Sequence, residues 1–168
     1  MSSSVFWRTV ICGFIATFVM TMISFIQGGV GLPVIDIGHI LKESFNFVHA
    51  TDPYTMLWGN TAYYIGGMLM ALIWVAFLKN VIPGNWLVQG AIYGVIISIF
   101  SGLVISPLVG LSAGDSFGIF YMDTWVPGKI LFAGVIMHIA YGITLTLGLK
   151  VAGVLKIKQG REPGFTGS

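Results

Sequence analysis

The sequence predicts an all-α, polytopic membrane protein with four transmembrane helices in a bundle. Hydrophobic residues make up 56% of the 168-residue chain, and Asp, Glu, Lys and Arg together make up only 8%, against about 25% in soluble domains. The mean hydropathy is +0.91. So few charged side chains cannot cover the surface of a water-soluble fold of this length. The lipid bilayer is therefore the expected solvent.

Four apolar segments are long enough to cross a bilayer, which takes about 20 helical residues. They cover residues 5–26, 56–77, 86–109 and 130–154. Backbone N–H and C=O groups in lipid need partners within their own segment, so each segment is expected to be a helix. We therefore predict one transmembrane domain over residues 1–158, followed by a flexible cytoplasmic tail over residues 159–168.

The basic residues predict the orientation of the chain. Six of the eight lie on the side that holds both termini and the connection between the second and third spans: Arg8, Lys79, Lys150, Lys156, Lys158 and Arg161. Cytoplasmic segments of membrane proteins are enriched in Lys and Arg, so both termini are expected in the cytoplasm, and a bacterial cytoplasmic membrane is the expected location. Basic residues do not alternate with the aromatic ones, so no nucleic acid is expected as a partner.

The two halves of the chain resemble each other, which indicates a 2+2 tandem repeat. The segment GFIATFVMTMIS, from Gly13, aligns with GAIYGVIISIFS, from Gly90. Likewise GLPVIDIGHIL aligns with GLSAGDSFGIF, which pairs Asp36 with Asp115. Two spans per repeat would give both halves the same orientation, about an axis along the membrane normal. Chance similarity between apolar segments is the alternative explanation.

Small residues recur at about every fourth position in the first and third spans. Residues four apart share one helix face, and small faces let helix backbones approach closely in lipid. We predict packing within the bundle, while a chain with 23 glycines also leaves faces for a second copy or for other membrane subunits. The packing residues are Gly13, Thr17 and Thr21 in the first span and Gly90, Gly94, Ser98 and Gly102 in the third.

His138 lies near the middle of the last span, with Gly134 and Gly142 one turn away on either side. Ionisable residues at this depth are candidates for function, and the glycines leave room for a flat cofactor or for a neighbouring helix backbone. Haem b or a quinone is the cofactor hypothesis, and a packing histidine is the alternative. Haem in a bundle usually has two axial ligands. No other span contains a histidine, so the sequence favours no cofactor.

Residues 33–46 have the pattern of a short amphipathic helix at the outer membrane interface. Pro33 suits the first helical position, and an acid such as Asp36 is favoured in the first turn. Asp36, His39 and Glu43 follow i, i+3, i+7 spacing, so their side chains can converge to hold a metal ion or share a proton. The alternative is the solvated face of an interfacial helix.

Three segments, GFIATFVMTMISFI, LPVIDIGHIL and MHIAYGITLTLGL, resemble a family of small, uncharacterised four-span bacterial integral membrane proteins. The resemblance covers most of residues 10–150 and implies a four-helix bundle without an assigned reaction. Members of this family often carry a histidine in the second span. This chain has the tyrosines of TAYYIGG (61–67) at the matching place, which counts against a haem or metal site.

The chain has no Gly-rich phosphate loop, nucleophile elbow or hydrolase triad, so catalysis is not expected. The sequence favours an accessory or structural subunit that packs in a homo-oligomer or in a larger, respiratory-type membrane complex. One alternative is a haem- or quinone-binding redox protein that uses His138. Another is a small proton-linked carrier that uses Asp36, His39 and Asp115, although no acid lies within any span.

Overall fold

The computed structural model describes residues 1–42, 54–113 and 127–155, and all regular secondary structure in these ranges is helical. Two π-helical turns, in which the hydrogen bonds run from i to i+5, interrupt the second and third spans. The elements are α1 (Ser3–Gly29), α3 (Thr55–Ile73), η1 (Trp74–Leu78), α4 (Trp86–Phe100), η2 (Ser101–Ile105), α5 (Ser106–Ala113) and α6 (Pro127–Val151). A short helical stretch also covers 37–42.

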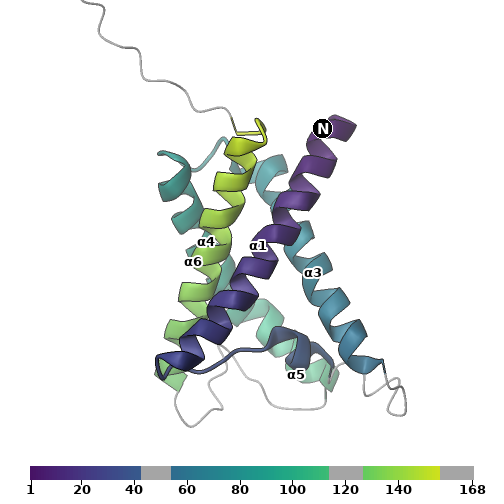
Figure 1. Ribbon diagram of the computed structural model, residues 1–168, viewed down its shortest axis with the longest axis vertical. Coiled ribbons are helices and arrows are strands. Elements are labelled where there is room, and N and C mark those ends of the chain that lie inside the picture. Colours follow the sequence, from purple (N-terminus) through teal and green to yellow (C-terminus); the bar gives the residue numbers. More distant parts are fainter. Residues whose placement is uncertain (43–53, 114–126, 156–168) are drawn as a thin grey trace, which may run out of the picture.

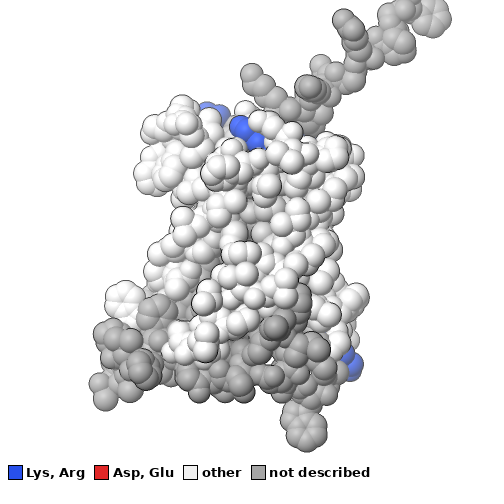
Figure 2. Space-filling model, turned by 180° about the vertical axis from the view of Figure 1, so that it is seen from behind, with Lys and Arg blue, Asp and Glu red and all other residues white. Residues whose placement is uncertain are grey.

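Four helical segments are long and apolar enough to cross a membrane, which confirms the fold class predicted from the sequence. They are Ser3–Gly29, Thr55–Leu78, Trp86–Ser112 and Gly128–Val151. The start of α1 and the end of α6 lie at the same end of the molecule (Figure 1), where Arg8 Nη1 donates to the Ala152 carbonyl at 2.8 Å. On the face shown in Figure 2, the coloured Lys and Arg side chains appear only towards the two ends.

The helices pack in the spatial order α3, α1, α6, α4. Helix α1 contacts both α3 and α6, and α6 also contacts α4. Helices α3 and α4 meet at Tyr93, whose hydroxyl donates to the Met70 carbonyl at 2.7 Å and whose ring centroid lies 4.7 Å from that of Trp74. Beyond this contact, towards α5 and the 37–42 stretch, the two helices enclose a cavity.

The two halves of the chain pack in the same register. A Cβ atom placed on Gly13 would lie 3.3 Å from the Gly67 carbonyl, and one placed on Gly90 would lie 2.7 Å from the Gly142 carbonyl. The neighbouring contacts follow the same spacing: Met68 and Ala71 on α3, Ile143 and Thr146 on α6. This matching register supports the tandem repeat that the sequence indicates.

The small residues of the first and third spans lie mainly at contacts within the chain. Gly94 packs so closely on α6 that a Cβ would meet the backbone of His138 and Ile139. Thr17 fills the space beside Gly67, and Ser98 and Gly102 are buried. Small residues let helix backbones approach closely, and the resulting van der Waals packing contributes to helix association in lipid.

The short outer helix begins at Ile37, so the helix predicted over residues 33–46 with Pro33 at its first position starts too early. The reason is a tertiary contact. Ser24 Oγ of α1 accepts from the Ile35 amide at 2.8 Å and donates to the Ile35 carbonyl at 2.9 Å. Both backbone groups of Ile35 are therefore bonded to α1 rather than to a helical turn.

The 37–42 stretch folds over the bundle and crosses the start of α3. A Cβ on Gly59 would meet the carbonyl of Gly38 and, at 2.7 Å, the amide nitrogen of Lys42. Figure 1 shows this stretch and α5 at the end of the molecule opposite the N-terminus. The remainder of the predicted helix, beyond Lys42, and the predicted tail (159–168) lie outside the described residues.

Candidate functional site

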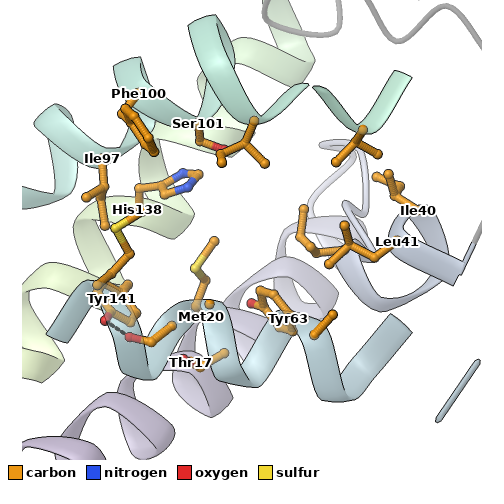
Figure 3. A pocket seen from close by; sticks show the side chains of 17 residues that line it. Thr17, Met20, Ile40, Leu41, Tyr63, Ile97, Phe100, Ser101, His138 and Tyr141 are labelled. Atoms are coloured by element: carbon orange, nitrogen blue, oxygen red, sulfur yellow. Dashed lines mark hydrogen bonds between the residues drawn. The ribbon is translucent and has the colours of Figure 1, made fainter. Parts of the chain in front are cut away.

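A cavity of ≈ 280 Å³ lies between α3 and α4 and is partly open to the exterior. Thr17 and Met20 of α1 and His138 and Tyr141 of α6 also line it, and the 37–42 stretch and α5 contribute further residues. Figure 3 shows these side chains converging from different helices. The volume is near the lower limit of about 300 Å³ for small-molecule sites, so the cavity suits one substituted ring.

The π-turn η2 shapes the wall that α4 contributes. Ile97, Ser101, Ile105 and Val109 lie four positions apart and all line the cavity. In a regular α-helix a step of four residues turns the side chain about 40° further around the axis, so the last of the four would lie well off the face of the first. The wider π-turn winds less per residue and keeps all four on one face. Such π-turns are frequent at functional sites.

The imidazole of His138 points into the cavity beneath Phe100 and Ser101 (Figure 3). Its Nδ1 atom lies 2.7 Å from the Gly134 carbonyl oxygen. A carbonyl only accepts, so Nδ1 carries the proton, and Nε2 of the neutral ring is then an acceptor. A charged ring is disfavoured at this membrane depth. In the described ranges, the structure records no hydrogen-bond partner for Nε2.

Two tyrosines give the cavity aromatic walls. The Tyr141 hydroxyl donates to the Gly67 carbonyl, as the dashed line in Figure 3 shows. The Tyr63 hydroxyl lies 3.4 Å from Thr21 Oγ1. Both rings line the cavity while their hydroxyl groups contact neighbouring helices. These rings therefore offer flat apolar surface more than hydrogen-bonding capacity.

Phe100 lines the cavity and is 41% exposed, so we place the opening of the cavity beside this side chain. Nearby on the two helices, Leu69 of α3 and Ile96 of α4 are also exposed. All three lie within segments that are apolar enough to span a membrane. The opening is therefore bounded by apolar side chains at the depth of the lipid chains.

The two glycines that flank His138 have different environments. Gly134 supplies the carbonyl that accepts from Nδ1, and a Cβ placed on it would only touch Ile35 Cδ1 at 3.9 Å. Gly142 lies against the backbone of Gly90 and Gly94. The sequence leaves room at Gly142 for a flat cofactor or for a neighbouring helix backbone. The structure shows the second, because Gly142 packs on the backbone of α4.

The polar cluster expected on the outer helix is only partly described. Asp36 Oδ1 accepts from the backbone amide of His39 at 3.0 Å, which is the contact of a helix N-cap. Glu43 and Asp115 lie outside the described residues. Within the described ranges no three His, Cys, Asp or Glu residues lie close enough to hold a metal ion. The metal and carrier hypotheses stay predictions.

Sequence reasoning missed most of the residues that line the cavity, among them Phe100, Ser101 and Tyr141. The four-residue spacing from Ile97 to Val109 is the one sequence feature that indicates a cavity wall. The same spacing is also typical of residues that pack against a neighbouring helix. The π-turn that keeps this stripe on one face has no recognisable signature in the residues of η2, SGLVI.

Comparison with known proteins gave no match. No family model matches the chain, and no curated protein or solved structure matches it. The resemblance to small four-span bacterial membrane proteins therefore stays a prediction.

Proposed function

We propose that this integral membrane protein takes up a lipid-soluble ring compound, of the quinone and quinol class, and holds it in the cavity between α3 and α4. The observation that carries the proposal is the Nε2 atom of His138. It is an acceptor without a recorded partner in the described residues, on a side chain that lines an otherwise largely apolar cavity. Apolar pockets with a few well-placed polar groups are typical of ligand sites.

The lining favours a flat ring over a lipid chain alone. Tyr63, Phe100 and Tyr141 all line the cavity, and aromatic side chains prefer offset-stacked or edge-to-face contacts with other rings. The opening beside Phe100 gives an apolar tail a path into the bilayer. A haem would need a larger slot and usually a second axial ligand from a facing helix.

The proposed location is the bacterial cytoplasmic membrane, with both termini in the cytoplasm. Among the described residues, Arg8, Lys79 and Lys150 belong to the end that holds the start of α1 and the end of α6, and Lys42 and Lys129 to the other. The full sequence strengthens this bias, because three more basic residues follow α6. Such a bias is typical of cytoplasmic segments.

Native mass spectrometry with a decyl-substituted hydroquinone and the matching benzoquinone tests the proposal. Gly66 lines the cavity, and a Cβ placed on it meets nothing within 4 Å. A leucine at this position, Gly66→Leu, should therefore fill the cavity without a clash at its Cβ. Gly29, which also has open space around it, gives the control Gly29→Leu outside the cavity.

The wild-type chain and Gly29→Leu should form a one-to-one complex with at least one of the two compounds. Gly66→Leu should weaken that complex by about tenfold or more, which corresponds to about 1.4 kcal/mol. Absence of any complex with either compound, or equal binding by Gly66→Leu, would contradict the proposal.

A second candidate function is the accessory subunit that the sequence favours. Only Gly59 and Ala71 are buried in α3, whereas eight residues are buried in α1. A span with so little burial has a wide face for lipid or for another subunit. Gentle solubilisation followed by native sizing tests it, and a strictly monomeric particle without a co-purifying protein would contradict it.

A further inference from the structure

The cavity holds very few hydrogen-bonding groups, and most of them are already engaged. Thr17 donates to the Gly13 carbonyl at 2.8 Å, and Tyr141 donates to the Gly67 carbonyl. Tyr63 pairs with a hydroxyl of α1, as described above. Among the described residues that line the cavity, His138 Nε2 and the Ser101 hydroxyl have no hydrogen-bond partner, and the Tyr63 hydroxyl, which accepts from Thr21, keeps its own proton.

His138 offers the cavity a lone pair and no proton. Its Nδ1 proton is directed to the Gly134 carbonyl at 2.7 Å, so Nε2 can only accept from a ligand. Ser101, at the start of η2, also lines the cavity and is drawn near the imidazole in Figure 3, and its hydroxyl can donate or accept. No hydrogen bond of Ser101 to another described residue is recorded. The pair therefore matches a ligand group that both donates and accepts.

On the basis of the proposed ligand-binding function, we infer that the cavity selects the hydroxyl-bearing form of the ring compound, a quinol or an alkylphenol. The ring hydroxyl donates to His138 Nε2 and accepts from Ser101 Oγ. A quinone carbonyl only accepts hydrogen bonds, so it cannot bond to Nε2, and the lone pairs of the two atoms would repel each other. Sites built around a hydrogen bond reject analogues that cannot make it, because a buried polar group is then left unpaired.

The tandem repeat explains why the ligand has one orientation. Tyr63 precedes His138 by the same 75 positions that separate Gly67 from Gly142, so the two residues hold equivalent places in the two halves. Both line the cavity. The first half presents a phenol ring whose hydroxyl contacts α1, and the second half presents an open acceptor. The hydroxyl end of the ligand therefore lies towards α6.

Three matched ligands test the inference: a decyl hydroquinone, the decyl benzoquinone and the dimethyl ether of the hydroquinone, compared by native mass spectrometry without oxygen. The dimethyl ether keeps the reduced ring and lacks the donors. The wild-type chain should bind the hydroquinone about tenfold more tightly than either of the others. His138→Phe, which keeps an aromatic ring of similar size, should bind all three alike.

The outcomes separate this inference from the proposed function. Equal binding of the three ligands by the wild-type chain would overturn the inference and leave the proposed cavity site standing. A preference for the hydroquinone that survives in His138→Phe would also overturn it. Failure of every ligand to bind would overturn both. The wild-type comparison alone decides the matter if His138→Phe does not fold.

Discussion

The Nδ1 atom of His138 lies 2.7 Å from the carbonyl oxygen of Gly134, one turn earlier in the same helix. This contact fixes which ring nitrogen carries the proton and leaves Nε2 as an acceptor. The ring would otherwise be free to present either a donor or an acceptor to the cavity. The hydrogen-bonding character of the cavity is thus set by one backbone carbonyl of α6.

The tautomer of His138 can be measured directly. We expect neutral imidazole with the proton on Nδ1, because a carbonyl cannot donate and a charged ring is disfavoured in lipid. Nitrogen-15 NMR of the histidine side chains distinguishes the two neutral tautomers, and His138→Phe assigns the signal. A proton on Nε2, or a charged ring at neutral pH, would contradict the described geometry.

The contact between α1 and α3 should depend on Gly67 but not on Gly66. A Cβ on Gly67 would overlap Thr17 Oγ1, whereas a Cβ on Gly66 meets nothing within 4 Å. We expect Gly67→Ala to cost about 1–3 kcal/mol of stability, as overpacking does, and Gly66→Ala to change it by less than about 0.5 kcal/mol. Thermal unfolding in detergent measures both.

A double variant provides the control for that contact. Thr17→Ala removes the hydroxyl that Gly67→Ala would meet, so the combination should recover part of the loss from Gly67→Ala. The expected coupling is about 0.5–3 kcal/mol, as for other residues in contact. Additive losses would show that the two residues do not share the close contact described here.

Ser24 should hold the segment that leads into the outer helix. Its hydroxyl bonds both the amide and the carbonyl of Ile35, so Ser24→Ala leaves two buried backbone groups without partners, at a cost of about 1–3 kcal/mol each. We expect faster hydrogen exchange at the Ile35 amide. Thr9→Ala removes a buried hydroxyl that bonds only within α1 and should leave that exchange rate unchanged.

Asp36 should act as a helix cap. Asp36→Ala removes the acceptor for the His39 amide and should cost about 1 kcal/mol, whereas Asp36→Asn keeps an acceptor and should cost little. Thermal unfolding compares the two variants. If the loss for Asp36→Asn equals that for Asp36→Ala, the role of this side chain depends on its charge and not on the cap.

The four spans were predictable from the sequence because length and apolar composition alone decide whether a segment crosses a bilayer. The start of the outer helix was not, because Ser24 and Ile35 bond across two elements and override the local preference of Pro33. A sequence pattern predicts secondary structure where the preferences of neighbouring residues decide it. The prediction fails where a side chain from another helix hydrogen-bonds the backbone N–H and C=O groups, as Ser24 does at Ile35.

The candidate site was only half predictable. His138 is evident in the sequence because it is the one histidine within a span, yet the cavity before it depends on how α3 and α4 pack. The π-turn that begins at Ser101 orients one wall of the cavity by changing the helical winding, and the residues of this turn do not reveal that change. The equivalence of Tyr63 and His138 emerges from the contacts of Gly67 and Gly142, since the aligned segments do not include the second and fourth spans.

The most direct measurement of the central claim is photolabelling of the chain in lipid nanodiscs. The probe is a decyl-substituted phenol with a diazirine on its ring, and peptide mapping locates the labels. Labels should concentrate on the two peptides that face the cavity, 62–70 and 97–109, fall when unlabelled decyl hydroquinone is added, and disappear in Gly66→Leu. Labels spread over lipid-facing residues such as Phe18 and Leu147, and unchanged in Gly66→Leu, would contradict a ligand site between α3 and α4.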